Sequence, residues 1–178
     1  MDMITRLLEG IASRLRIAWH RLRGANIRGH ITLRAVEIPR HPQCITLEAG
    51  AALDRGVTLL ATHDSASIKI GARVYINRHT ILDASDSIEI GAGVMIGPFC
   101  YITDHDHSAG PGIEPAAGPL ISQPTHIEAN CWLGAHVTVL KGVTIGAGSV
   151  VGAGSVVTKS LPAGVVAVGN PARVLREL

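Results

Sequence analysis

The feature that most constrains the fold is an aliphatic residue that returns at every sixth position. In its longest stretch the positions are Ile127, Leu133, Val139, Ile145, Val151 and Val157. Shorter stretches with the same period, in other registers, run over Leu47–Leu59, Ile70–Ile88 and Ile90–Ile102. A period of six differs from the helical period of 3.6 and is typical of a short strand followed by a turn.

Three such units make a triangular coil of about 18 residues, with the aliphatic side chains pointing inward. The composition agrees with a narrow and regular core. The chain has only two Trp, two Tyr and one Phe among 178 residues, whereas it has 20 Gly. Rings normally fill irregular space, so their scarcity favours repeated small cross-sections. We therefore predict an all-β fold, a parallel β-helix over residues 25–168.

The N-terminal segment has a different pattern. Apolar residues follow helical spacing at Ile4, Leu7, Leu8, Ile11, Leu15, Trp19 and Leu22, and arginines cover much of the remaining surface. This predicts an amphipathic helix within residues 1–24. Residues 1–40 hold eight basic and three acidic residues. Two roles stay open for the helix: packing against the prism or a neighbouring subunit, or lying on an anionic membrane surface.

Several classes of protein are disfavoured. Charges at Arg6, Glu9 and Arg14 interrupt the N-terminal stretch, which argues against a secretory signal or a membrane span. The three cysteines form no CxxC pair, so we expect reduced thiols in a cytoplasmic protein. Basic residues interleaved with aromatics are missing, so nucleic acid is not an expected partner.

The sixfold phase is lost between Ile102 and Ile127, which predicts a loop extruded from the prism at about 104–124. The loop opens with two histidines and two carboxylates at 104–107. Histidine is the usual general base near neutral pH, and a carboxylate can orient its ring. Asp104, Asp106 and Asp83, about one coil earlier, are the candidate partners of His105. A solvated polar loop, or a metal site using His105 and His107 on one face, are the other interpretations.

The C-terminal sequence carries a resemblance. The segment from Ile127, which ends in VVTKSLPAGVVAVGNPARVLREL, is similar to the hexapeptide-repeat acetyltransferases. It resembles in particular the galactoside and maltose O-acetyltransferases and related enzymes of surface-polysaccharide clusters, and the resemblance covers about residues 65–178. It implies left-handed coiling, a C-terminal tail over 169–178, acetyl-CoA as co-substrate, no metal, and a homotrimer with the site between two prisms.

The resemblance also implies site residues. The catalytic histidine follows Thr-x, which selects His105, with His107 as the fallback. Acceptor contacts match Asn77 and Asp83, although their spacing is shorter than in the sugar-specific enzymes. Coenzyme A contacts match Trp132, Gly134, Ala135, Ala153, Thr158, Lys159, Arg173 and Arg176. The implied activity is acetyl transfer to a hydroxyl of a sugar or polysaccharide precursor, with an amino sugar or serine as alternative acceptors.

Two further functions compete with acyl transfer. One is a zinc enzyme of the carbonic-anhydrase kind on the same fold, for which His63, His79, His105, His107, His126 and His136 supply material. The other is a β-helix that binds a partner through its flat faces without catalysis. The Thr-Lys pair and the Pro-x-Arg tail disfavour the first, and the polar loop disfavours the second.

Overall fold

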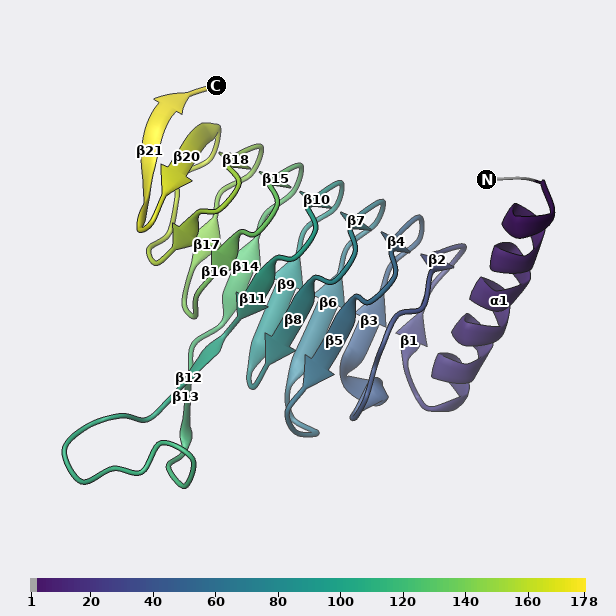
Figure 1. Cartoon of the computed structure of the whole chain (residues 1–178), viewed down its shortest axis with the longest axis horizontal. Helices are drawn as coiled ribbons and strands as arrows, with labels where there is room; N and C mark the ends of the chain where they lie inside the picture. The colour runs from purple at the N-terminus through teal and green to yellow at the C-terminus, as the bar shows by residue number, and fades with distance from the viewer. Residues whose placement is uncertain (1–2) are drawn as a thin grey trace.

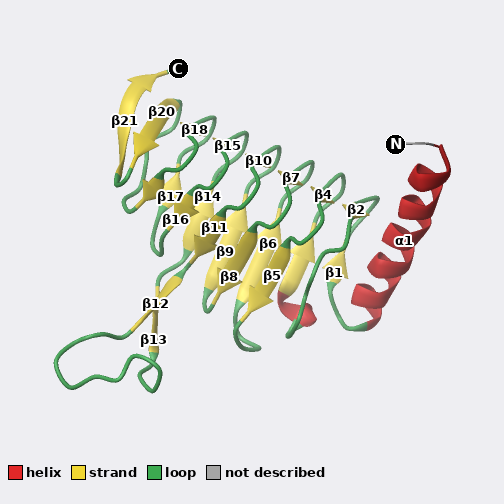
Figure 2. Ribbon diagram, viewed as in Figure 1, coloured by secondary structure: helices red, strands yellow, loops and turns green. Residues whose placement is uncertain are grey.

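The computed structural model describes residues 3–178, except for the side chains of Met3, Ile4 and Arg6. One helix, α1 (Met3–Leu22), precedes a stack of short strands that runs to the C-terminus (Figure 1). Ile4 belongs to the predicted apolar face of the helix, but its side chain lies outside the described part of the structure. Apart from α1 and the 3₁₀ turn η1 (Pro42–Cys44), the ribbon consists of strands and loops (Figure 2).

The strands form three long sheets and one hairpin. Sheet A contains β1 (Asn26–Ile27), β3 (Ile45–Leu47), β6 (Ser67–Ile70), β9 (Ser87–Ile90), β14 (Thr125–Ile127) and β17 (Thr144–Ile145). Sheet B contains β2 (Thr32–Leu33), β4 (Ala52–Leu53), β7 (Tyr75–Ile76), β10 (Met95–Ile96), β15 (Trp132–Leu133), β18 (Val150–Val151), β20 (Val165–Gly169) and β21 (Ala172–Glu177). Sheet C contains β5 (Thr58–Ala61), β8 (Ile81–Ala84), β11 (Tyr101–Thr103), β16 (Thr138–Val139) and β19 (Val156–Val157). The hairpin pairs β12 (His105–His107) with β13 (Leu120–Ser122).

The chain passes through sheets A, B and C in turn, and each coil pairs in parallel with the next. In sheet B, Ile76 lies between Leu53 and Ile96, and Ile96 pairs on its other side with Leu133. The one antiparallel neighbour in these sheets is β21, which folds back on β20. The predicted fold class is confirmed: the chain is a left-handed parallel β-helix with an N-terminal helix and an extruded loop.

The aliphatic residues of the sixfold pattern fill the interior of the prism. Ile76, Leu82 and Ile145 are fully buried, and the other predicted inward positions are buried as well. The longer strands of the N-terminal coils each place two side chains inside, as Ile88 and Ile90 do from β9. Each of these strands therefore has two inward positions, two residues apart. The sixfold repeat in the sequence follows one of them in some coils and the other in later coils, and this shifts its register.

The turns between sheets B and C form a tightly stacked edge, here called the B–C corner. His79, Phe99 and His136 each have φ of 58° there. Their rings stack with centroids 5.2 and 5.1 Å apart. A Cβ on Gly134 would lie 2.6 Å from the backbone nitrogen of Ala153. Glycine at this position lets successive coils approach closely.

Helix α1 closes the N-terminal end of the stack, where it packs against β1 and β2 (Figure 1). The Ser13 hydroxyl accepts a hydrogen bond from Leu33 N at 2.9 Å, and the Arg16 guanidinium donates to Leu33 O at 2.6 Å. The helix thus packs against the prism, one of the two roles left open, and does so through these polar groups together with Ile17, which packs against the core. Within the described residues, no helix is long and apolar enough to cross a bilayer.

Candidate active site

The polar loop leaves the prism where sheet C ends and returns where sheet A begins. Its base is closed by two hydrogen bonds. Gln123 N donates to Asp104 O at 2.8 Å, and the Thr125 hydroxyl donates to Thr103 O at 2.9 Å. The hairpin β12–β13 then carries the rest of the loop away from the stack (Figure 1). The first residues of the loop are therefore held by the rigid prism.

The Asp104 carboxylate is the buried anchor of this region, with its side chain fully buried. Its Oδ1 accepts from Ser85 N at 2.8 Å, and its Oδ2 accepts from Asp86 N, also at 2.8 Å. Both donors belong to the turn after β8 in the coil below. A buried carboxylate that accepts hydrogen bonds from two backbone amides has both oxygens acting as acceptors and is fixed in position.

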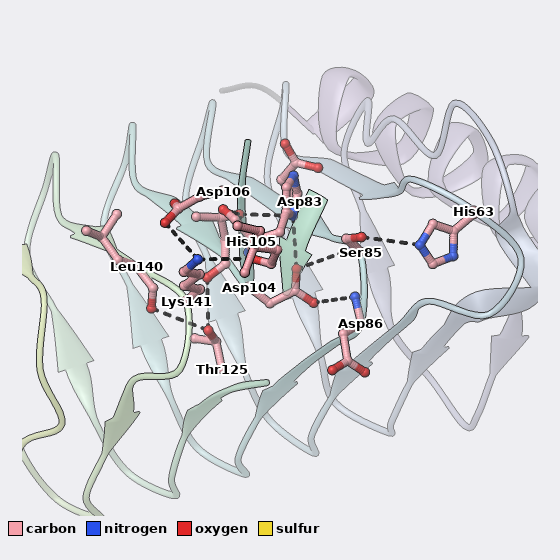
Figure 3. A network of polar contacts seen from close by, with 12 residues as sticks. His63, Asp83, Ser85, Asp86, Asp104, His105, Asp106, Thr125, Leu140 and Lys141 are labelled. Atoms are coloured by element: carbon pink, nitrogen blue, oxygen red, sulfur yellow. Dashed lines mark hydrogen bonds and ion pairs between the residues drawn. The ribbon is translucent and has the colours of Figure 1, made fainter. Parts of the chain in front are cut away.

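His105 lies directly on this carboxylate, with its Nδ1 3.0 Å from Asp104 Oδ1 (Figure 3). The Thr103 hydroxyl is 3.3 Å from the same nitrogen. Because an ionised carboxylate only accepts hydrogen bonds, we assign the ring proton of neutral His105 to Nδ1. Nε2 then carries the free lone pair, and among residues 3–178 it has no hydrogen-bond partner. This is the orientation that a general base requires.

The other charged residues of the DHDH segment have different partners. Asp106 lies on the opposite face of β12 and pairs with Lys141 Nζ at 3.0 Å. Lys141 also donates to Ile121 O at 3.1 Å, which ties the hairpin to the next coil. His107 Nδ1 donates to Pro115 O at 3.1 Å, farther out on the loop. Of the carboxylates considered from sequence, the structure thus joins Asp104 to His105, and Asp106 to Lys141.

Asp83 lies in the coil below, where it is paired in register with Thr103. Its Oδ2 accepts from the Tyr101 hydroxyl at 3.0 Å, whereas its buried Oδ1 has no partner among the described residues. Burial, followed by the adjacent Asp83 charge, raises the pKa of Tyr101 to about 12, so the phenol remains a donor at neutral pH.

The structure places Asn77 apart from this group. It follows β7 at the B–C corner, and its Oδ1 accepts from Arg78 N at 2.8 Å. His105 follows the C-terminal end of β11. It therefore lies on the side of sheet C where the strands end, whereas the B–C corner lies on the side where they begin. Within one chain, the two predicted acceptor residues therefore do not converge: Asp83 is near His105 and Asn77 is not.

The predicted coenzyme A residues fall into three groups. Gly134, Ala135 and Ala153 stack at the B–C corner, beside the half-exposed Trp132 on β15. Thr158 and Lys159 follow β19 at the other edge of sheet C, and both are exposed. Arg173 and Arg176 lie on β21, where their guanidinium groups donate only to the carbonyls of Ala172 and Glu177 in the described structure. These cations are available to an anionic ligand.

The arrangement can hold and move a proton at His105 Nε2. In residues 3–178, no three His, Cys, Asp or Glu side chains are grouped so that they could hold a metal ion. The three cysteines are free thiols, and burial raises the pKa of both Cys100 and Cys131. The chemistry that the site offers is therefore proton abstraction from a hydroxyl or amine, assisted by a fixed carboxylate.

Known proteins share both the repeat and the fold. A family described as bacterial transferase hexapeptide (six repeats) matches residues 124–159. A solved hexapeptide-repeat acetyltransferase from Vibrio cholerae, complexed with acetyl coenzyme A, is 30% identical, with a TM-score of 0.67. The alignment covers 93% of this chain and 77% of that one. The chain belongs to the hexapeptide-repeat acetyltransferases.

Curated members of the family give a similar result. A probable acetyltransferase of Mycobacterium tuberculosis is 32% identical over 84% of this chain and 50% of its own length. The galactoside O-acetyltransferase of Escherichia coli K12 is 39% identical over 64% of this chain and 55% of its own length. The chain thus spans about half the length of the curated relatives that it matches.

The sequence of this hexapeptide-repeat acetyltransferase predicted the charged residues of the site, but not all of their hydrogen-bond partners. It placed Asp104 among three candidates but did not find the backbone amides of Ser85 and Asp86 that anchor it. Nor did it find Tyr101 as the partner of Asp83, or Lys141 as the partner of Asp106. The available signal was register: Tyr101 and Thr103 belong to the strand that stacks on Ile81–Ala84, which brings Asp83 beside them.

Proposed function

We propose that this protein transfers an acetyl group from acetyl-CoA directly to a hydroxyl of a sugar or polysaccharide precursor. The observation that carries the proposal is the contact between His105 Nδ1 and the buried Asp104 carboxylate, at 3.0 Å. It leaves Nε2 as a base at the root of the loop. The relatives named above supply the donor and the acceptor class, since one is complexed with acetyl coenzyme A and another is a galactoside O-acetyltransferase.

In the proposed reaction, His105 Nε2 takes the proton of the acceptor hydroxyl as its oxygen attacks the thioester carbon. Asp104 stabilises the imidazolium that forms. The backbone N–H of Ala135 donates to the developing oxyanion. When the tetrahedral intermediate collapses, the carbon–sulfur bond breaks and the imidazolium returns its proton to the departing thiolate. The acetyl group passes directly from donor to acceptor through this tetrahedral intermediate, without an acyl-enzyme.

Coenzyme A would be bound by the three groups of residues described above. The small residues at the B–C corner allow an extended pantetheine arm to approach the backbone, with Trp132 beside it. Lys159, Arg173 and Arg176 would receive the phosphates, because guanidinium and ammonium groups bind phosphate oxygens strongly. Thr158 lies next to Lys159 and would contact the same ligand.

A homotrimer forms part of the proposal because the site is incomplete in one chain. Ala135 and Asn77 lie at the B–C corner, whereas His105 lies at the opposite edge of sheet C. A second prism alongside the first would bring its B–C corner to the His105 of its neighbour. Light scattering should report three chains per particle, and a monomer that retains full activity would contradict this assembly.

The test of the catalytic role compares two histidines of the same loop. His105→Ala should reduce turnover in a thiol-release assay with acetyl-CoA by roughly 10²–10⁴-fold, the usual contribution of general acid–base catalysis. Binding of acetyl-CoA, measured by calorimetry, should stay within about twofold. His107→Ala is the matched control and should retain most activity, because His107 bonds to Pro115 O on the loop. Equal losses in the two variants would reject the assignment.

The acceptor is tested with a panel in the same assay. Galactosides and polysaccharide fragments should release thiol faster than amino sugars or serine. Faster release with an amino sugar, and an acetamide product in mass spectra, would replace O-acetylation by N-acetylation. Full activity after treatment with a chelator would exclude the zinc enzyme, and acetyl-CoA turnover itself would exclude the non-catalytic scaffold.

A further inference from the structure

The large apolar side chains of α1 face solvent. The exposed fractions are 65% for Leu7, 60% for Leu8, 47% for Ile11, 67% for Leu15, 57% for Trp19 and 82% for Leu22. The steps of three and four residues place these side chains on one stripe along the helix. At 1.5 Å per residue, the stripe is roughly 22 Å long. Such a contiguous apolar surface marks a contact site, because isolated soluble proteins rarely expose one.

The opposite side of α1 faces the prism and is mainly polar, with Ile17 as the apolar residue that packs against the core. Ser13 and His20 are buried there, with 6% and 4% of their surface exposed. The first coil has no preceding coil to pair with, and arginines in the helix and directly after it donate hydrogen bonds to its open carbonyls. Arg21 donates to Ile27 O at 2.8 Å, and Arg23 donates to Ile38 O at 2.8 Å. The helix thus covers an exposed sheet edge with its polar side and has its apolar side free.

The position of the helix decides which partners can reach the stripe. The helix lies across the N-terminal end of the stack, and its far side points away from the coils (Figures 1 and 2). Copies of the chain arranged alongside the prism would contact the flat faces of sheets A, B and C. A lateral assembly, including the proposed trimer, would therefore leave the stripe uncovered.

The charge around the stripe favours an anionic surface. Residues 1–40 hold eight arginines and three acidic residues, although the whole chain has a net charge of only +2. Arg14 is exposed beside the stripe and has no ion-pair partner among the described residues. The Arg23 guanidinium lies 5.9 Å from the centre of the Trp19 ring. An indole next to a cation, with apolar residues on one side, is typical of helices that lie at a membrane–water interface.

We propose that α1 docks this protein on the surface of a bilayer that contains anionic lipid. The helix lies in the plane of the headgroups with the stripe from Leu7 to Leu22 inserted toward the acyl chains. Arg14 lies at the level of the lipid phosphates, and the prism stands on the aqueous side with its coils stacked away from the bilayer. The inference does not depend on the acyl acceptor or on catalysis.

The direct test uses Trp19 as the reporter. In a Trp132→Phe background, Trp19 is the only tryptophan of the chain. Vesicles of phosphatidylcholine with a minority of phosphatidylglycerol should shift its fluorescence to shorter wavelength, and lipids brominated in the upper acyl chain should quench it. Flotation should recover the protein with these vesicles. Pure phosphatidylcholine and high salt should each weaken recovery several-fold, because screening removes the electrostatic contribution.

Variants distinguish binding to vesicles through the stripe from non-specific adsorption of the protein. Leu15→Gln should weaken the partition coefficient about tenfold and Arg14→Gln roughly fivefold. The control is Leu178→Gln, since Leu178 is 63% exposed at the opposite end of the prism and should bind vesicles as the parent does. Ile11→Gln gives a second variant of the stripe, and thermal melts check that each variant is folded.

Three results would overturn the proposal. The first is a parent protein that does not float with anionic vesicles. The second is a folded Leu15→Gln protein that binds as tightly as the parent. The third is a particle whose mass by light scattering is halved by Leu15→Gln, with no binding to vesicles, since a second copy of the chain would then cover the stripe. Assays of acetyl transfer with soluble acceptors are unaffected by these outcomes.

Discussion

Asp104→Asn tests the pairing at the centre of the site most sharply, because it removes one charge and no volume. The carboxylate accepts three hydrogen bonds, from Ser85 N, Asp86 N and His105 Nδ1. The amide group of asparagine has one accepting atom and one donating atom. Whichever way it is turned, its NH₂ group therefore faces a buried N–H or the ring nitrogen of His105.

The geometry gives the size of the two effects. If the NH₂ group faces Asp86 N, one buried donor loses its partner, which costs about 1–3 kcal/mol of unfolding free energy. If it faces Ser85 N, it also lies against His105 Nδ1. It can then donate to that nitrogen and move the ring proton to Nε2, which removes the base. In both orientations the carboxylate charge that stabilises the imidazolium is lost, so we expect kcat to fall by roughly 10²–10⁴-fold, with the KM for acetyl-CoA nearly unchanged.

The assay measures thiol release alongside a thermal melt of each variant. Asp106→Asn is the matched control, since Asp106 forms a half-exposed pair with Lys141 and surface pairs contribute about 0–1 kcal/mol. It should keep most activity and stability. The reasoning is refuted if folded Asp104→Asn protein turns over as fast as the Asp106→Asn control.

Other predictions concern the scaffold. Gly134→Ala should lower the unfolding free energy by about 1–3 kcal/mol, because its Cβ would lie 2.6 Å from Ala153 N. Gly10→Ala, whose Cβ meets nothing within 4 Å, should raise it by roughly 0.5–1 kcal/mol; denaturant midpoints measure both. Leu82→Ala should cost about 2–5 kcal/mol by the same measurement, since Leu82 is fully buried. Burial, and then Arg23, lower the pKa of His20 from its ordinary value of 6.5. Below that pH the unfolded chain binds a proton that the folded chain resists, so the unfolding free energy should decrease as the pH is lowered through this value. His20→Gln should flatten this dependence in thermal melts.

The prism could be predicted from sequence because its period is set by the coil itself. Each unit must place one branched aliphatic side chain inside, so positions such as Leu133 and Val151 show the fold without any long-range information. The orientation of α1 could not be predicted in this way. Helical spacing shows that Leu8 and Ile11 share a face, but which face meets the prism depends on the open carbonyls of the first coil, which only the assembled structure reveals.

The site was predictable to the extent that it is local. Thr103, Asp104 and His105 are neighbours in sequence, so the histidine and a set of carboxylates could be named. The choice among the carboxylates depends on amides 18 and 19 residues away, at Asp86 and Ser85. Asn77 shows the other limit. A motif match places it in the site, whereas the single chain places it across sheet C, and only an assembly could join the two.

The closed base of the loop has a consequence for how such a chain can change. Thr103 and Thr125 are bonded across the gap, and Ile102 and Ile127 keep their places in the stack, so the inserted segment leaves the strand pairs intact. The entropy of closing a flexible segment grows only with the logarithm of its length, about 0.6 kcal/mol for each doubling. Insertions between Asp106 and Ile121 are therefore thermodynamically cheap. Such insertions can change the residues that surround His105, while the rigid stack below continues to hold the histidine and its carboxylate in place.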